Sequence, residues 1–246
     1  MQLYENERCD EVNDSLKLIQ KTEGLTFGTD ALLLAGYIKG KFKSGLEIGS
    51  GSGIITMLLL TRGKLLSADC VEVQEEYATL TRRNAELNGL SDKIRVICGD
   101  VRELHHAGEY DLVYTNPPYM KADSGEGCRE GAKHIARHEV HGTIGEFCTA
   151  AAGLLRFGGT FAVVYRPDRL TDLLFEMRRA GLEPKSITFV HATTEKEASM
   201  VLILAKRGGN SGAVLTKPLI IYDNGKYGKD MDYIMENGKF ADDFYR

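Results

Sequence analysis

The stretch Leu46-Glu47-Ile48-Gly49-Ser50-Gly51-Ser52-Gly53 decides the predicted fold, because a short apolar strand runs directly into three glycines at alternate positions. Ile54 to Thr61 then reads as an apolar helix. Glycine adopts backbone conformations that other residues avoid and leaves no Cβ in the way of a ligand lying over the loop. The spacing is not the G-x-G-x-x-G of nicotinamide binding, and no Gly-Lys-Ser/Thr follows, as a phosphate loop would require.

Acidic residues lie near the ends of the next two predicted strands. Leu65 to Val73 is the second strand and carries Glu72, which can accept hydrogen bonds from both ribose hydroxyls of an adenosine cofactor. Ile94 to Cys98 is the third, and Asp100 after it lies on the same rim of a doubly wound sheet, where it can meet an adenine amine. Asp100 could also simply cap the short segment from Val101 to Leu104. The series of strand, glycine loop, helix, strand and acid predicts a site for an adenosine-containing cofactor.

A fourth predicted strand, Tyr110 to Thr115, runs into Asn116-Pro117-Pro118-Tyr119. Two consecutive prolines cannot continue a strand, so the chain leaves the sheet there. The Asn116 amide offers a donor and an acceptor, and the Tyr119 ring offers a face on which a planar base can stack. Proline restricts its own φ and the residue before it, so little ordering entropy is lost on binding. We interpret the turn as a substrate site, although an Asn-Pro dipeptide by itself often does no more than end a strand.

The rest of the pattern alternates helices with strands. The remaining predicted helices are Ala31 to Ile38 (capped by Thr29 or Asp30 and buried), Glu75 to Leu87, Ile144 to Leu155 and Leu170 to Ala180; the remaining strands are Thr160 to Tyr165 after a Gly158-Gly159 turn, Ile187 to Val190 and Ser199 to Ala205. This order predicts an α/β fold with a Rossmann-like seven-stranded doubly wound sheet and an antiparallel strand pair at one edge. We expect a single domain over residues 1–246, with a core at about 25–205 and a C-terminal extension at 206–246.

Composition excludes several classes of protein. The net charge of −4 gives no global basic field, so a nucleic-acid partner would need a local patch or shape-driven binding. The five cysteines form no CxxC pair or zinc-type cluster, which predicts neither a disulfide framework nor a metal. No signal-peptide segment and no apolar run near 18 residues is present, so we expect a cytoplasmic protein without membrane contact. The oligomeric state stays open.

The motifs Gly49-Ser50-Gly51-Ser52-Gly53, Glu72, Asp100 and Asn116-Pro117-Pro118-Tyr119, in this order, resemble those of amino-methyltransferases that use S-adenosylmethionine on a seven-stranded Rossmann-like sheet. The resemblance covers about residues 25–205. Three softer strings, Thr29 to Leu34, Ala136 to Glu139 and Pro218 to Tyr222, resemble a narrower family. These are the bacterial tRNA adenine-N6 methyltransferases that act on adenosine 37 of valine tRNA. The mildly acidic composition departs from what an RNA-modifying family leads one to expect.

The resemblance implies a role for each motif. Gly49, Gly51 and Gly53 would admit the methionine part of the cofactor, Glu47 would bind its amino group, Glu72 would bind the ribose and Asp100 the adenine. Thr29, Asp30, Val73 and Val101 would complete the cofactor site. Asn116 and the Pro117 carbonyl would accept the hydrogen bonds of the target amine, with Pro118 stiffening the turn, and Tyr119 would stack on a base splayed out of the anticodon loop. Methyl transfer would then be direct and in line, without a metal.

Other acceptors use the same kind of turn. Related methyltransferases modify a glutamine of translation release factors, or adenine in DNA or ribosomal RNA. A release-factor enzyme is expected to carry a helical domain before the glycine loop, whereas only about 45 residues precede Leu46. A DNA enzyme is expected to carry a larger target-recognition insertion, and none is visible. A cofactor-binding or RNA-binding module without catalysis is a further alternative. The polar residues 120–141 are interpreted either as a substrate-contacting loop or as a solvated one.

Overall fold

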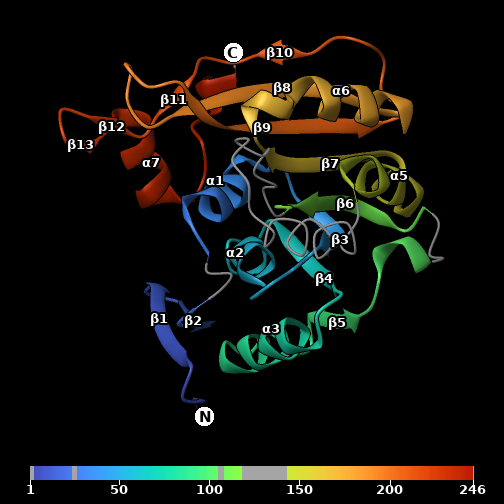
Figure 1. Ribbon diagram of the computed structural model, residues 1–246, viewed down its shortest axis with the longest axis vertical. Helices are drawn as coiled ribbons and strands as arrows, with labels where there is room; N and C mark the ends of the chain where they lie inside the picture. The colour runs from blue at the N-terminus through green and yellow to red at the C-terminus, as the bar shows by residue number, and fades with distance from the viewer. Residues whose placement is uncertain (1–2, 24–26, 105–107, 118–142, 246) are drawn as a thin grey trace, which may run out of the picture.

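A twisted mixed sheet forms the centre of the molecule in the computed structural model, which describes residues 3–23, 27–104, 108–117 and 143–245 (Figure 1). Its strand order is β10-β8-β9-β7-β6-β3-β4-β5, and β11 also pairs with β8. The five strands from β5 to β7 are parallel, and β9 runs antiparallel to both of its neighbours. The seven long strands confirm the predicted doubly wound sheet with its antiparallel pair, and the short strands β10 and β11 extend it.

The elements of the central sheet follow the predicted order, and β7, β8 and β9 are longer than predicted. The strands are β1 (Glu7–Asn13), β2 (Leu16–Lys21), β3 (Phe42–Ile48), β4 (Leu65–Glu72), β5 (Ile94–Cys98), β6 (Tyr110–Thr115), β7 (Leu155–Tyr165), β8 (Leu182–His191), β9 (Ala198–Arg207), β10 (Val214–Leu215), β11 (Leu219–Ile220), β12 (Tyr222–Asp223) and β13 (Lys226–Tyr227). The helices are α1 (Thr29–Tyr37), α2 (Ile54–Thr61), α3 (Glu75–Leu87), α5 (Ile144–Leu154), α6 (Leu170–Arg179) and α7 (Lys229–Asn237), with the 3-10 turns η1 (Val101–Glu103), η2 (Pro167–Arg169) and η3 (Asp242–Tyr245).

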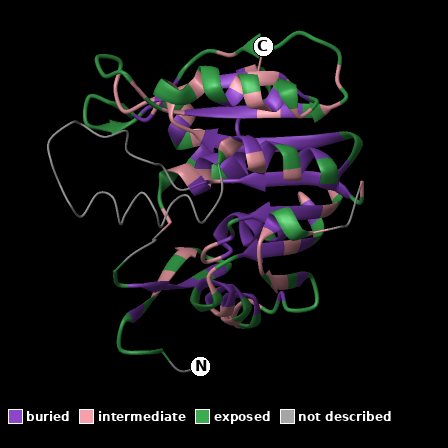
Figure 2. Cartoon of the chain, turned by 45° about the vertical axis from the view of Figure 1, so that its right-hand side comes forward, coloured by how far each residue is buried: buried purple, intermediate pink, exposed green. Residues whose placement is uncertain are grey.

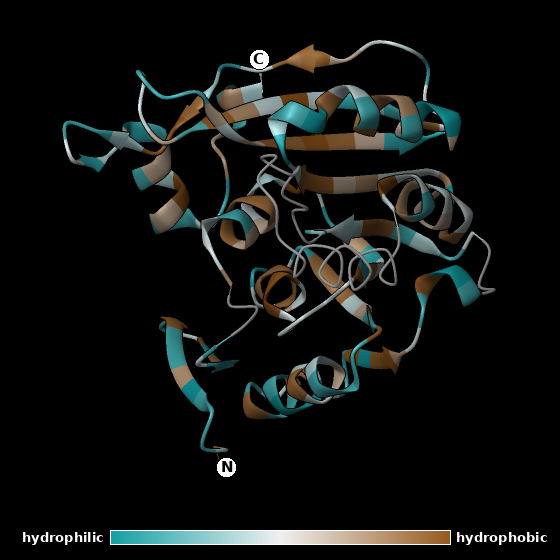
Figure 3. Ribbon diagram, viewed as in Figure 1, coloured by the Kyte–Doolittle hydropathy of each residue, from teal (hydrophilic) through white to brown (hydrophobic). Residues whose placement is uncertain are grey.

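Helices cover both faces of the sheet, and the sheet is buried between them (Figure 2). One core cluster joins α1 and α2 to side chains such as Leu112 and Tyr114. The other joins α5 and α6 to Val113, which lies between Leu112 and Tyr114 in the strand. This alternation follows from the two-residue period of a strand. Every residue of α2 from Ile54 to Leu60 is buried, and the helix is brown in Figure 3. No helix within the described residues has the length and apolarity needed to cross a membrane.

Strand β7 differs from the prediction, because Gly158 and Gly159 do not form a turn that precedes the strand. They lie inside it, where the register against β6 shifts between Tyr110 and Leu112. Gly158 has φ of 75°, which only glycine adopts easily, so the strand takes up extra residues without ending. Gly159 lies so close to its neighbours that a Cβ there would be 2.8 Å from the Arg156 carbonyl oxygen. The two glycines therefore form an irregularity within a strand of 11 residues.

Residues after 206 pack against the core. Strands β10 and β11 add to the edge strand β8, and α7 lies beside α1 (Figure 1). Phe240 packs against Tyr37 of α1, Phe244 packs against Phe240, and the Tyr245 hydroxyl donates to the Tyr37 carbonyl oxygen at 2.8 Å. The segment predicted to be an extension thus supplies part of the largest core cluster.

Candidate active site

Strand register brings the predicted site residues to one rim of the sheet. Ile48, the last residue of β3, pairs with Thr115 of β6, so Gly49 and Asn116 leave the sheet side by side. Glu72 ends β4, next to β3, and pairs with Cys98 of β5, two residues before Asp100. The carboxyl ends of these four parallel strands thus line up the glycine loop, both acids and the asparagine, as expected at the ligand-binding edge of a doubly wound sheet.

The glycine loop depends on left-handed backbone conformations. Gly49, Gly51 and Gly53 have φ values of 68°, 55° and 79°. Around Gly49 and Gly51, nothing lies within 4 Å of the place where a Cβ would stand, so the loop leaves open space there. Gly53 is also sterically restricted, because its Cβ would lie 2.8 Å from Cγ2 of Thr81. The first two glycines therefore open space for a ligand, and the third allows the loop to pack on α3.

Helix α3 fixes this loop through two polar side chains that sequence reasoning did not single out. The Thr81 hydroxyl donates to the Gly51 carbonyl oxygen at 2.8 Å. The Asn84 amide donates to the carbonyl oxygens of Ser52 and Ile19, both at 3.0 Å, and accepts from the Ile19 amide at 2.7 Å. Thr81 and Asn84 are three residues apart and fully buried, so they lie on the inner face of the helix. Polar residues at the spacing of the apolar face of this amphipathic helix were the signal that could have identified them.

Replacing Gly53 with alanine is expected to destabilise the protein more than replacing Gly63. Both glycines have positive φ, 79° and 63°, so both substitutions place alanine in a backbone conformation that glycine adopts more easily. Only Gly53 has close neighbours, since nothing lies within 4 Å of a Cβ at Gly63. The clash should cost Gly53→Ala about 1–3 kcal/mol more in the free energy of unfolding, measured in urea. Equal losses in the two variants would contradict this account of the loop.

Glu47 lies beneath the loop in a closed polar network. Its Oε2 accepts from the Thr56 amide at 3.2 Å and from the Thr56 hydroxyl at 2.5 Å. Because that hydroxyl has one proton, the Tyr114 hydroxyl donates to it at 2.5 Å, and the Cys70 thiol donates at 3.3 Å. Burial raises the pKa of Glu47 to about 8, and the hydrogen bonds from Thr56 oppose the shift. The carboxyl group is therefore mostly protonated at neutral pH.

Glu72 is buried at the tip of β4, and its carboxylate is held by backbone amides. Gly51 donates to Oε2 and Gln74 donates to Oε1, each at 3.0 Å. A carboxylate oxygen accepts more than one hydrogen bond, so both oxygens keep capacity for a ligand. Val73, the next residue, is 40% exposed at the same rim, which is unusual for a large apolar side chain beside a buried strand. The acid and the apolar side chain together suit a sugar next to a flat ring.

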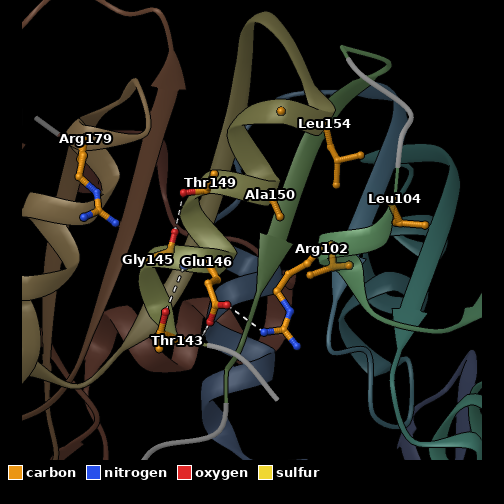
Figure 4. A pocket seen from close by; sticks show the side chains of 11 residues that line it. Arg102, Leu104, Thr143, Gly145, Glu146, Thr149, Ala150, Leu154 and Arg179 are labelled. Atoms are coloured by element: carbon orange, nitrogen blue, oxygen red, sulfur yellow. Dashed lines mark hydrogen bonds and ion pairs between the residues drawn. The ribbon is translucent and has the colours of Figure 1, made fainter. Parts of the chain in front are cut away.

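Asp100 is engaged by Arg102. It accepts from the Arg102 amide at 2.9 Å as the cap of η1, which confirms the capping alternative, and it also binds the Arg102 guanidinium. The Arg102 guanidinium also donates to Glu146 Oε1 on α5 at 2.8 Å, and Figure 4 shows these two side chains facing each other. The two side chains line a cleft of about 500 Å³, together with Val101, Leu104 and others. The cap does not exclude the predicted adenine-binding role of Asp100, which stays a prediction.

Asn116 is oriented by the start of α1. Its Nδ2 donates to Asp30 Oδ2 at 2.9 Å, while Asp30 Oδ1 accepts from the Ala31 amide at 2.9 Å. The helix begins after Gly28, so neither Thr29 nor Asp30 is its cap residue as predicted. The bond to Asp30 fixes which way the Asn116 amide faces, and the oxygen Oδ1 is the end of that amide that can accept hydrogen bonds.

Some of the remaining predicted site residues are described by the structure, and others lie outside the described residues. Thr29 is exposed at the start of α1, Pro117 is buried beside Asn116, and Val101 is buried beneath the rim. Pro118, Tyr119 and the polar stretch 120–141 lie outside the described residues, so their predicted roles stay predictions. The contact between Asp30 and Asn116 was not predicted, because no local pattern links residues that are 86 positions apart.

Comparisons with known proteins agree with this geometry. A family model described as methyltransferase small domain matches residues 22–175. The chain is 35% identical over 145 residues to the tRNA1(Val) (adenine(37)-N6)-methyltransferase of Serratia proteamaculans, covering 57% of this chain and 55% of that protein. It is 31% identical over 188 residues to the protein of the same name from Aeromonas hydrophila, covering 74% of this chain and 77% of that protein.

Solved structures show the same fold. A predicted O-methyltransferase from Agrobacterium tumefaciens superposes with a TM-score of 0.70 at 22% identity, covering 86% of this chain and 97% of that chain. A geranyl diphosphate methyltransferase in complex with S-adenosylmethionine gives a TM-score of 0.53 at 14% identity, covering 73% and 84%. The matched family model, together with the relative at 31% identity, identifies the chain as a member of the methyltransferase small domain family.

Proposed function

We propose that this protein transfers a methyl group from S-adenosylmethionine to the N6 amine of an adenine in tRNA, with adenosine 37 of valine tRNA as the expected target. The observation that carries the proposal is the adjacency of the open glycine loop and Asn116 at the ends of β3 and β6. The curated relatives, whose names state this activity, support the choice of acceptor. A protein of this function has RNA as its partner.

The residues present fit S-adenosylmethionine. The open space above Gly49 and Gly51 admits a ligand close to the backbone. Glu72 keeps hydrogen-bonding capacity for the ribose hydroxyls, and the exposed Val73 side chain can lie against the adenine. Glu47 would meet the amino group through its carboxyl oxygen that is not held by Thr56. Each of these roles is a proposal for this chain.

The bound cofactor supplies an electrophilic methyl group. The chain then has to position a poor nucleophile, because the lone pair of an aromatic amine is delocalised into the ring. Asn116 Oδ1 and the Pro117 carbonyl would each accept one amine hydrogen, which favours a pyramidal nitrogen with its lone pair directed at the methyl carbon. Positioning of this kind can contribute roughly 7–11 kcal/mol at best. Tyr119 would hold the base by stacking.

Asp30 is proposed to act through Asn116, so its loss should affect turnover and not cofactor affinity. Asp30→Ala removes the acceptor that fixes the Asn116 amide. We expect kcat to fall about tenfold or more, the scale of one lost hydrogen bond to a carboxylate, with the Kd for S-adenosylmethionine unchanged. Asp30→Asn keeps an acceptor oxygen and should retain most activity. A raised Kd with an unchanged kcat would instead assign Asp30 to the cofactor site, as the sequence predicts.

The function is tested by incubating the protein with labelled S-adenosylmethionine and RNA from cells that lack it. Label should appear in tRNA as N6-methyladenosine, located by nucleoside mass spectrometry and by mapping of the modified tRNA. Parallel reactions with release factors, DNA and ribosomal RNA test the other acceptors. Label in one of these and none in tRNA would replace the proposed substrate, and label in none would favour the non-catalytic alternative.

A further inference from the structure

The hairpin β12–β13 exposes a pair of stacked tyrosines. Tyr222 and Tyr227 are cross-strand partners, and their ring centroids lie 5.5 Å apart with an angle of 20° between the planes. Their residues are 44% and 41% exposed. Every other ring pair in the described part of the chain contains a ring of Tyr37, Phe240 or Phe244, which are buried. Flat aromatic surface is therefore offered to solvent at this pair.

The hairpin is held rigidly by its backbone. Asn224 and Gly225 have φ values of 48° and 76°, the two left-handed residues of a type I′ turn. The Tyr222 amide donates to the Ala192 carbonyl oxygen at 2.8 Å, and the Gly228 amide donates to the Ile221 carbonyl oxygen at 2.9 Å. The first bond ties the hairpin to the segment that follows β8, and the second closes the hairpin at its base. A ligand that stacked on the rings would lose little entropy in ordering the protein.

The hairpin lies beyond the same rim of the sheet as Asn116. Strand β11 is parallel to β8 and pairs with its last residues, Val190 and His191, so the chain leaves the sheet at that end. Figure 1 shows β12 and β13 beyond the end at which β6 points. Four strand spacings of about 4.8 Å and some five residues of about 3.3 Å separate Asn116 from Tyr222, which gives roughly 25 Å. A nucleic acid with one base at Asn116 can span this distance with a few nucleotides.

We propose that Tyr222 and Tyr227 form a stacking platform for an unpaired base of the RNA substrate, a few nucleotides from the adenine at Asn116. This inference rests on the proposed function and adds a second contact to it. Aromatic side chains bind single-stranded bases by stacking, independently of sequence. Stacking also suits a chain with a net charge of −4, which has no global basic field to attract phosphates.

A cross-strand ring pair also stabilises a hairpin, and the first experiment separates the two roles. The double variant Tyr222→Thr/Tyr227→Thr keeps strand-forming residues but removes both rings. We expect its KM for tRNA to rise about tenfold or more, the scale of one stacked base, with the Kd for S-adenosylmethionine unchanged. Tyr222→Phe/Tyr227→Phe keeps the rings and should keep the wild-type KM. Phe157→Thr is the matched control, because Phe157 is 77% exposed near the start of β7, at the opposite rim.

A second experiment reads the contact directly and does not depend on catalysis. The chain contains no tryptophan, so Tyr227→Trp introduces a single fluorescent reporter. Stacking of a base on the indole should quench its emission as tRNA is added, whereas Phe157→Trp should show no quenching. Tyr227→Trp should also keep a KM close to that of the wild type, since a ring is retained.

The outcomes distinguish this inference from the proposed function. If wild-type protein methylates tRNA, while the threonine variant has an unchanged KM and the indole of the Tyr227→Trp variant is not quenched, the platform is refuted and the function stands. A rise in KM that the phenylalanine variant shares would also refute it, because stacking does not need the hydroxyl groups. If the wild type modifies a protein and the hairpin variants impair that reaction, the surface binds protein and the RNA platform is wrong.

Discussion

Replacing Asn116 with alanine is expected to lower kcat for tRNA about a hundredfold or more, the scale observed when one positioned polar group is removed from an active site. The variant loses the oxygen that would accept the amine hydrogen, and it leaves Asp30 without its amide partner. The Kd for S-adenosylmethionine should change less than kcat does, since Gly49, Gly51 and Glu72 stay in place. Single-turnover methyl transfer with saturating cofactor measures the effect on chemistry.

The control for this substitution is Asn210→Ala, which changes an exposed asparagine in the segment between β9 and β10. It should keep wild-type kinetics, and both variants should unfold at similar temperatures. Wild-type turnover in Asn116→Ala would remove Asn116 from the mechanism. A loss of activity that follows a loss of folded protein would show a structural role only.

Replacing Glu47 with glutamine is expected to stabilise the protein increasingly as pH rises. Between the ordinary pKa of 4.5 and the folded-state pKa of about 8, the unfolded chain loses the Glu47 proton while the folded chain keeps it. The contribution of Glu47 to stability therefore decreases as pH rises through this range. Glutamine cannot ionise and still accepts the hydrogen bonds of Thr56. The free energy of unfolding of the variant, relative to wild type, should rise by about 3–5 kcal/mol from pH 4.5 to pH 8.

Denaturant unfolding at several pH values between 4.5 and 8 measures this difference. The control is Glu86→Gln on α3, which makes the same substitution at an exposed position. Parallel stability curves for wild type and Glu47→Gln would mean that the buried carboxyl group ionises normally. The hydrogen bonds of Tyr114 and Cys70 to Thr56 would then need a different explanation.

Local patterns were sufficient to predict most of the fold. The apolar run of α2 and the strand β6 occupy the predicted residues, because hydrophobic pattern and proline or glycine boundaries define them locally. The antiparallel pair β8–β9 was confirmed, although both strands extend further than predicted. The matched family is also as predicted, since the glycine loop, Glu72, Asp100 and Asn116 occur in one order at the ends of successive strands.

Contacts between distant segments could not be predicted in the same way. The bond between Asp30 and Asn116, and the network of Glu47 with Thr56 and Tyr114, depend on which strands become neighbours. The glycine irregularity in β7 was misread as a turn, because glycine pairs occur in both settings. The position of the C-terminal segment depends on rings that pack against α1, which no local periodicity encodes.

Asn84 of α3 and Asn88, which caps the C-terminal end of this helix, also protect the molecule from self-association. One edge of β2 pairs with β1, and the other would offer free backbone groups to a foreign strand. Asn84 bonds both backbone groups of Ile19, and Asn88 accepts from the Lys17 amide at 3.0 Å and donates to its carbonyl oxygen at 2.7 Å. Side-chain amides thus occupy the positions that a third strand would take. An apolar segment that could otherwise template aggregation is sealed by the same helix that supports the glycine loop.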